Sequence, residues 1–216
     1  MIDKDAHAQQ DAPAQKDAHA RQDAPAHKLR LSRPQRLWRL LKASLDPRAW
    51  AHLIKMVNFY NYTHVAPLRQ IRLGANPSIS PTAAFSYPER IRIGARVRIG
   101  FRCVIWAGPG KGRVILGDDV LLGPEVMITA SGYRYNDGAP ITDQASDEAD
   151  VVIGNDVWLG TRVTVLPGAR IGDGAIIGAH SVVRGDIPAM AIAVGSPARV
   201  VSQRQIQGAS IKDDPQ

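Results

Sequence analysis

Few residues of this chain are of types that could do chemistry by themselves. It has one cysteine, Cys103, six histidines, and a glycine-rich segment, AGPGKGR, at residues 107–113. A thiolate can act as a nucleophile, a histidine can move protons or bind a metal, and a glycine-rich turn can cradle a phosphate. The segment lacks the spacing of a phosphate-binding loop and the Ser or Thr after its lysine, so it predicts no such loop.

Three of the histidines lie in a polar repeat near the N-terminus. Residues 5–28 read DAHAQQ-DAPAQK-DAHARQ-DAPAHK and contain His7, His19 and His27. Short units rich in Ala and Pro have no large apolar residue to bury, so we predict a disordered low-complexity tail over residues 1–28. A solvated spacer is favoured over a metal site there, and the sequence predicts no bound metal.

A repeat of six residues organises the region from Val151 to Val201. Neither a helix nor a strand alone gives this period. A short strand plus a tight turn does, and three such units make one triangular coil of a parallel β-helix. Aliphatic residues would fill the prism, and small residues four positions later would fit beside its corners. The aliphatic set is Ile153, Leu159, Val165, Ile171, Ile177 and Val183, and the small set begins with Val157, Val163, Ala169 and Ala175.

Less regular hexads precede this region, starting at Leu73. Cys103 falls in one of their small inward positions, which predicts a core thiol rather than a nucleophile. The segment 107–113 breaks the coil once, and residues 131–150 abandon the repeat altogether. A long excursion from a regular solenoid is where a functional site is expected.

Residues 29–62 are predicted to form two basic amphipathic helices. Pro34 suits the first turn of one helix, and Asp46-Pro47 suits the cap and first turn of the other. We favour packing of their apolar faces against the end of the β-helix or a neighbouring subunit. Contact of residues 29–57 with an anionic membrane is the alternative, and the two are compatible. No nucleic-acid-binding motif accompanies the charge, so we expect no nucleic acid partner.

The composition fits one domain with appendages. Aromatic residues make up only 6% of the 216 residues and Gly occurs 19 times, which suits a narrow prism. The formal charge of +7 is concentrated in the basic segment 29–62. Residues 203–216 are predicted to form a polar tail. A single cysteine indicates a reducing compartment, so we expect a cytoplasmic protein, with the inner face of the membrane as a further location. The sequence shows neither the apolar region of a signal peptide nor 18 consecutive apolar residues.

The run IGNDVWLGTRVTVLPGARIGDGAIIGAHSVVRGDIP, followed by VGSPARVV, resembles the hexapeptide-repeat acyltransferases. Within them it is most similar to the branch that O-acetylates sugars and polysaccharides. The resemblance covers residues 63–202, and its most specific features are the VW-[IL]-G step, the D-I-P step and the G-x-P-A-[KR]-V ending. It implies a left-handed parallel β-helix, a homotrimer, and acetyl-CoA lying in the groove between neighbouring prisms.

In this family a histidine deprotonates the acceptor hydroxyl, and backbone N–H groups stabilise the oxyanion. Here Tyr133 stands at the position of that histidine. A phenol, with a reference pKa of about 10, is a poor base at neutral pH. Three explanations stay open. Asp137, Tyr135 or His180 acts as the base, a histidine from elsewhere such as His64 reaches the groove, or the chemistry has lapsed.

The resemblance also implies contacts with the two substrates. Tyr133 could position a sugar, and Tyr135 and Asn136 belong to the same substrate-binding loop. Small residues would line the pantetheine arm of CoA, and two arginines match positions that face its phosphates. These cofactor-binding residues are Gly160, Thr161, Gly178, Ala179, Arg184 and Arg199.

We therefore expect a CoA-dependent O-acyltransferase that acetylates a sugar hydroxyl of an exopolysaccharide or its precursor. The alternative is a catalytically lapsed trimeric homologue that binds sugar or CoA as a regulator or scaffold. A β-helix carbonic anhydrase is disfavoured, because its zinc needs three histidines and only His64 and His180 are expected in the prism.

Overall fold

The computed structural model describes residues 32–205. The predicted tail at residues 1–28 and most of the predicted C-terminal tail lie outside the described residues. The chain divides into two compact units between His52 and Leu53.

Two helices begin where the sequence predicts. Helix α1 (Arg33–Ser44) has Pro34 in its first turn, and the backbone N–H of Ser32 donates to the Gln35 side chain at 3.0 Å. Helix α2 (Pro47–Tyr60) follows Asp46, whose carboxylate accepts the N–H of Arg48 at 2.9 Å. Such caps satisfy N–H groups that have no partner within the helix. No residue of either helix is buried. Within residues 32–205, no helix is long and apolar enough to cross a membrane.

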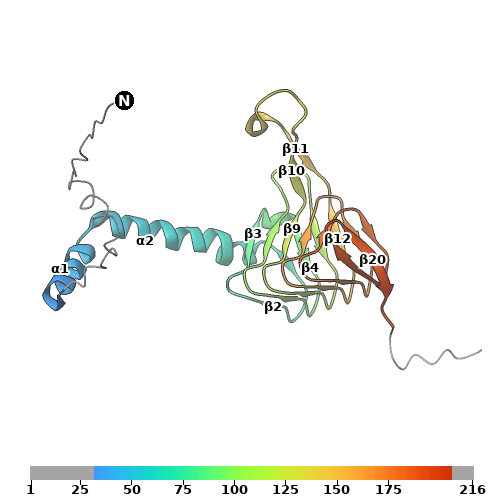
Figure 1. Cartoon of the computed structure of the whole chain (residues 1–216), viewed down its shortest axis with the longest axis horizontal. Coiled ribbons are helices and arrows are strands. Elements are labelled where there is room, and N and C mark those ends of the chain that lie inside the picture. The colour runs from blue at the N-terminus through green and yellow to red at the C-terminus, as the bar shows by residue number, and fades with distance from the viewer. Residues whose placement is uncertain (1–31, 206–216) are drawn as a thin grey trace, which may run out of the picture. The chain divides into compact units, whose positions relative to one another are not determined.

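The second unit contains a triangular prism of three sheets, which Figure 1 shows from the side, and their strands are parallel except for the last pair, which is antiparallel. Face A contains β1 (Arg72–Leu73), β4 (Ile91–Ile93), β7 (Val114–Leu116), β12 (Val151–Ile153), β15 (Arg170–Ile171) and β18 (Asp186–Ile187). Face B contains β2 (Ser78–Ile79), β5 (Arg98–Ile99), β8 (Leu121–Leu122), β13 (Trp158–Leu159), β16 (Ile176–Ile177), β19 (Ala191–Gly195) and β20 (Ala198–Gln203). Face C contains β3 (Ala84–Ser86), β6 (Val104–Trp106), β9 (Met127–Thr129), β14 (Thr164–Val165) and β17 (Val182–Val183). The chain visits A, B and C in turn, so it has three edges, A–B, B–C and C–A.

The interior confirms the predicted hexads. Each of the six aliphatic residues from Ile153 to Val183 has 3% or less of its surface exposed. Cys103 is fully buried, as predicted, and its thiol donates to the carbonyl of Gly123 at 3.2 Å. Burial raises the pKa of the Cys103 thiol above its ordinary value, because the thiolate would lose its hydration. This cysteine therefore serves the core and is a poor nucleophile.

The prism is closed at its first coil by a short helical segment. A π-helical turn (Asn61–Val65) and a 3₁₀ turn (Ala66–Arg69) follow α2, and Pro67 and Ile71 of this region are buried. The sequence places His64 in the prism, and this is wrong. The helical conformation continues through His64 to Arg69, because the apolar residues after it cover the open end of the core, and the first strand begins at Arg72.

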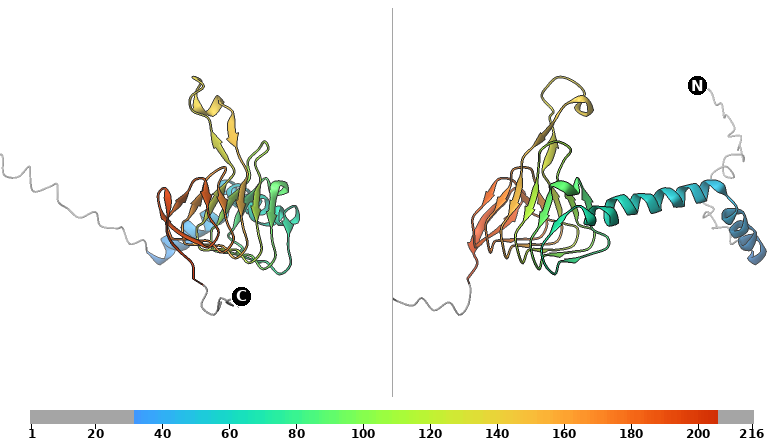
Figure 2. Two further views of the ribbon diagram at one scale, coloured as in Figure 1. Left: turned by 90° about the vertical axis from the view of Figure 1, so that its right-hand side faces the viewer. Right: turned by 180° about the vertical axis from the view of Figure 1, so that it is seen from behind.

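All three departures from the coil leave the prism at the C–A edge. They are a 3₁₀ turn (Pro88–Arg90), the glycine-rich loop 107–113, and the excursion after β9. The last of these forms an antiparallel hairpin of β10 (Ser131–Tyr133) and β11 (Ser146–Glu148), with a 3₁₀ turn (Ile141–Asp143) between the two strands. We call residues 130–150 the arm. Figure 2 shows in two further views that it projects from the prism.

Candidate functional site

The arm carries four of the predicted site residues. Tyr133 ends β10 opposite Ser146, and 66% of its surface is exposed. Tyr135, at 73%, is also exposed, as are Asn136 and Asp137 beyond it. The backbone therefore presents this run of polar and aromatic side chains to solvent.

A buried amide holds the tip of the arm in shape. The side-chain oxygen of Gln144 accepts the N–H of Asp137 at 3.1 Å, and its nitrogen donates to the carbonyl of Ala139 at 2.6 Å. Gln144 is only 8% exposed, so these bonds are shielded from water. They fix the backbone at Asp137, one of the residues proposed as a base.

The base of the arm is anchored by Glu148. Its carboxylate accepts backbone N–H groups of Gly110 at 2.6 Å, Gly112 at 2.7 Å, and Lys111. Successive N–H groups that point into one concavity form an anion-binding nest. The bond from Gly112 is the largest of the influences that lower the pKa of Glu148. The glycine-rich loop thus binds an anion after all, but the anion belongs to the protein.

A second set of predicted residues lies on the B–C edge. Thr161, Ala179 and His180 are exposed there, and the N–H of His180 donates to the carbonyl of Thr161 at 2.9 Å. We call this stacked pair of corners, Gly160–Arg162 and Gly178–His180, the ledge. Its glycines are required by the stacking of the coils. A Cβ on Gly160 would lie 2.7 Å from the nitrogen of Ala179, and one on Gly178 would lie 2.7 Å from the side chain of Val194.

The ledge continues into a row of charges that the sequence interpretation missed. Glu125 pairs with Arg162 at 2.5 Å and faces Arg102 at 3.9 Å, one coil away on either side. The hydrogen bond from Arg162 is the largest influence that lowers the pKa of Glu125, and the charge of Arg102 contributes in the same direction. The sequence does contain a pattern that marks this row. Each member is the second residue after a corner glycine, in the triplets Gly100-Phe101-Arg102, Gly123-Pro124-Glu125, Gly160-Thr161-Arg162 and Gly178-Ala179-His180.

The two predicted phosphate-facing arginines lie in different places. Arg199 is on β20 opposite Val194, next to the ledge, and its guanidinium donates to the carbonyl of Ala198 at 3.1 Å. Arg184 follows β17 and therefore lies at the C–A edge, on the side of the arm. Within one chain, the ledge and the arm belong to different edges of the prism. The fold of a single chain therefore does not bring these two sets of predicted residues together.

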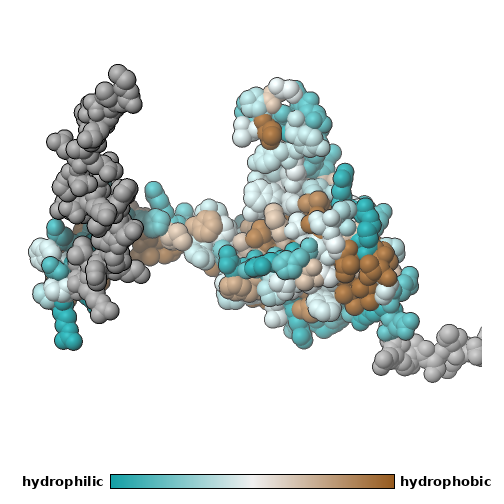
Figure 3. All heavy atoms as spheres, viewed as in Figure 1, coloured by the Kyte–Doolittle hydropathy of each residue, from teal (hydrophilic) through white to brown (hydrophobic). Residues whose placement is uncertain are grey.

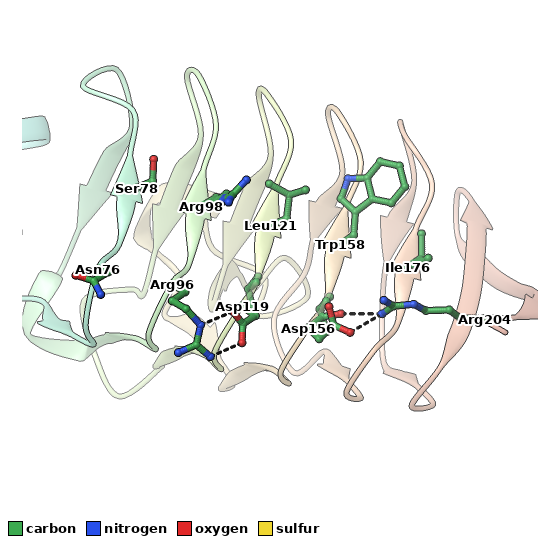
Figure 4. Close-up of a pocket in the computed structure, with 12 residues that line it drawn as sticks. Asn76, Ser78, Arg96, Arg98, Asp119, Leu121, Asp156, Trp158, Ile176 and Arg204 are labelled. Atoms are coloured by element: carbon green, nitrogen blue, oxygen red, sulfur yellow. Dashed lines mark hydrogen bonds and ion pairs between the residues drawn. The ribbon is translucent and has the colours of Figure 1, made fainter. Parts of the chain in front are cut away.

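Face B carries a groove that contains none of the predicted site residues. It has a volume of about 700 Å³. Its floor is a column of outward residues in register across the sheet, namely Ser78, Arg98, Leu121, Trp158 and Ile176 (Figure 4). Ion pairs line its A–B rim, between Arg96 and Asp119 at 2.6 Å and between Arg204 and Asp156 at 2.7 Å.

The apolar part of face B continues toward the last coil. Trp158 is 49% exposed, and Val194, Val200 and Val201 on β19 and β20 are exposed as well. Figure 3 shows a hydrophobic area over this end of the prism. An exposed apolar surface of this kind is typical of a protein–protein contact.

Comparisons with known proteins identify the repeat. Residues 150–185 match the family model described as bacterial transferase hexapeptide (six repeats). Residues 90–130 match the model described as the hexapeptide repeat of succinyl-transferase. Both matched ranges lie within the prism.

Two curated relatives and one solved structure are similar over most of the prism. Rv3034c of Mycobacterium tuberculosis, named as a probable acetyltransferase, is 35% identical over 178 residues, which cover 78% of this chain and 57% of that protein. WcaF of Escherichia coli, named for an acetyltransferase role in colanic acid biosynthesis, is 30% identical over 135 residues, or 62% of this chain and 69% of WcaF. A galactoside acetyltransferase solved in complex with coenzyme A is 32% identical with a TM-score of 0.57, over 62% of this chain and 65% of that one. The chain thus spans little more than half the length of Rv3034c.

Proposed function

Because the chain belongs to the hexapeptide-repeat acetyltransferases, we propose that it transfers an acetyl group from acetyl-CoA to a saccharide hydroxyl. We further propose an exopolysaccharide or its precursor as the acceptor. The name of WcaF, which refers to colanic acid biosynthesis, supports that choice. A relative solved with coenzyme A supports the donor.

The ledge is the observation that carries this proposal. It presents the exposed outer positions of Thr161 and Ala179 one coil apart, and it ends beside Arg199. Backbone groups between small side chains can approach a pantetheine chain closely, and a guanidinium suits the phosphates at its far end. Arg184 lies at the other edge, so in this proposal it meets a CoA molecule bound against a neighbouring protomer.

In the proposed reaction the acceptor oxygen attacks the thioester carbonyl, the C–S bond breaks, and CoA leaves as its thiol. A base must remove the hydroxyl proton as the new C–O bond forms. We propose His180 for this role, because it lies on the ledge itself, whereas Tyr133, Tyr135 and Asp137 lie on the arm and reach a ledge only through a neighbouring protomer in this proposal. Tyr133 then positions the saccharide through its hydroxyl and ring.

We propose a homotrimer in which the arm of one protomer reaches the ledge of the next. The positions of the ledge and the arm on different edges and the apolar end of face B support this assembly. The catalytically lapsed binding protein is the second candidate function. It is motivated by one expectation from the resemblance, that Tyr133 takes the place of the family's histidine.

The experiment begins with calorimetry of acetyl-CoA binding, followed by an assay of CoA release in the presence of acceptor glycans. The assay can use a thiol reagent, since Cys103 is buried and reacts slowly in the folded protein. Ala179→Trp should block the ledge and abolish binding. Ala189→Trp, an exposed corner residue on the A–B edge, is the matched control. Absence of acetyl-CoA binding to the wild type rejects the enzyme, and binding without transfer to any glycan tested favours the lapsed homologue.

We also propose that α1 and α2 hold the protein at an anionic membrane surface. Leu37, Trp38 and Leu41 of α1 are 51–62% exposed, and Arg36 and Arg39 lie on its opposite face. On α2, the apolar residues Trp50, Leu53, Ile54 and Val57 share one side, and Arg48 and Lys55 lie on the other. Asp46 is the one acidic residue between residues 32 and 60. An apolar side flanked by cations is typical of helices that lie in the membrane interface.

Vesicle sedimentation tests the membrane contact. The protein should sediment with vesicles that contain phosphatidylglycerol and remain in solution with phosphatidylcholine alone. Leu41→Glu should prevent sedimentation and leave the prism folded, because α1 belongs to the other unit. Equal sedimentation of Leu41→Glu and the wild type would reject the contact.

A further inference from the structure

A pair of arginines stands side by side on face A at its first two strands. Arg72 of β1 lies directly opposite Arg92 of β4 in the parallel register. Neighbouring strands are about 4.8 Å apart. Like charges placed directly opposite each other on a sheet are destabilising.

At the other end of face A, the same column of outward residues contains a pair of opposite charges. There Arg170 of β15 lies opposite Asp186 of β18, which places opposite charges together. Arg72 and Arg92 have no such neighbour. Neither forms an ion pair with any residue in the described range 32–205.

The two arginines belong to a groove of about 230 Å³ whose other charges are largely matched. Arg113 on its wall is paired with Asp150, and its backbone N–H donates to the same carboxylate at 3.0 Å. Arg90 donates to the carbonyl of Gly108 at 3.2 Å and lies 3.7 Å from Glu89. The local pairs therefore leave an excess of positive charge at Arg72 and Arg92.

We propose that this groove binds the phosphate or pyrophosphate group of a phosphorylated saccharide. Two adjacent guanidinium groups can each offer a fork of donors to phosphate oxygens, and the anion relieves their repulsion. The pair of Arg113 and Asp150 joins the groove to the last residue of the arm, so a sugar attached to the bound phosphate lies beside the arm base. That this saccharide is the acetyl acceptor rests on the proposed function, whereas the anion site itself does not.

The first experiment measures binding of inorganic pyrophosphate by calorimetry at low ionic strength. The double variant Arg72→Gln/Arg92→Gln should bind at least about tenfold more weakly than the wild type. Arg98→Gln removes an exposed arginine from β5 on face B and should change the Kd less than about twofold. An unchanged Kd in the double variant, or an equal loss in Arg98→Gln, would overturn the proposal.

Thermal unfolding without pyrophosphate shows whether the double variant is folded. Removal of the like-charged pair should keep or raise its Tm. Pyrophosphate should raise the Tm of the wild type and leave that of the double variant unchanged. A Tm of the double variant that rises with pyrophosphate as much as that of the wild type would reject the site.

CoA also contains a pyrophosphate, so a further binding experiment compares UDP-glucose with CoA as ligands. The double variant should lose about tenfold in affinity for UDP-glucose and retain its affinity for CoA. The opposite pattern would assign the groove to CoA and overturn the proposal. If the wild type binds pyrophosphate but never transfers acetyl, the proposed function is rejected and the proposed anion site is kept. If it transfers acetyl without binding pyrophosphate, the anion site is rejected and the proposed function is kept.

Discussion

The carboxylate of Glu148 accepts the backbone N–H of Gly112 at 2.7 Å, and this bond ties the arm to the preceding coil. Gly110 and Lys111 donate to the same carboxylate, and the neighbouring pair of Arg113 and Asp150 adds a second tie. The residue that anchors the arm and the loop that holds it are about 36 positions apart in the sequence. The position of Tyr133 therefore depends on backbone groups of a loop that is far from it in the sequence.

Glu148→Gln should lower the free energy of unfolding by about 1–2 kcal/mol, because a neutral amide accepts fewer and weaker bonds from the three N–H groups. Since the arm carries Tyr133, the variant should also raise the KM for the saccharide more than it lowers kcat. Chemical denaturation and steady-state kinetics measure the two effects. Asp143→Asn, another exposed carboxylate of the arm, is the control. Equal KM values for Glu148→Gln and the wild type would contradict a positioning role.

The stability that Glu148 contributes should depend on pH. Its pKa in the folded protein lies below the ordinary value of 4.5, since the N–H groups favour the carboxylate. A lowered pKa means that the contribution is complete above pH 4.5 and is lost as the pH falls through the folded-state pKa. The difference in unfolding free energy between the wild type and Glu148→Gln should therefore shrink on acidification from pH 7 toward pH 3. A difference that grows over this range would show that another group is responsible.

Gly160→Ala should disturb the ledge itself. Its new Cβ would lie 2.7 Å from the backbone nitrogen of Ala179, so the two coils must move apart at the corner. We expect a loss of about 1–3 kcal/mol in stability and weaker binding of acetyl-CoA. Gly132→Ala is the control, since a Cβ there meets nothing within 4 Å. Calorimetry that gives the same acetyl-CoA affinity for Gly160→Ala and the wild type would separate the ledge from donor binding.

Much of the fold follows from residues that are close in the sequence. The spacing of Ile153, Leu159 and Val165 predicts three short strands around a narrow core, and these residues are buried as expected. The same periodicity predicts that Cys103 is buried, and it is. The starts of α1 and α2 can also be predicted from the local sequence, because Pro34 and Asp46 each act within one turn of their own positions.

The site was less predictable because it depends on contacts between distant residues. The sequence gives no sign that Glu148 fills the nest of the loop 107–113, since a nest is made by backbone N–H groups and is compatible with many sequences. The resemblance, which covers residues 63–202, predicts His64 in the prism, but helical turns occupy residues 61–69 before the first coil. In the sequence, the only sign of the row from Arg102 to His180 is that each member stands two places after a corner glycine.

Complementation between two inactive variants tests whether the site lies between protomers. Tyr133→Ala removes the side chain from the arm, and His180→Ala removes the proposed base from the ledge. In a random mixture of equal amounts, a site formed by one arm and the ledge of a neighbour is intact in about one quarter of cases. Refolding the two variants together should therefore recover up to about a quarter of the wild-type rate, measured by CoA release, while each variant refolded alone stays inactive. A site formed within one chain would give no recovery, because each subunit would still carry one of the two defects. Light scattering on the same samples must show the same molar mass for the mixture and the parents, so that a missing recovery reflects the geometry of the site rather than failed assembly.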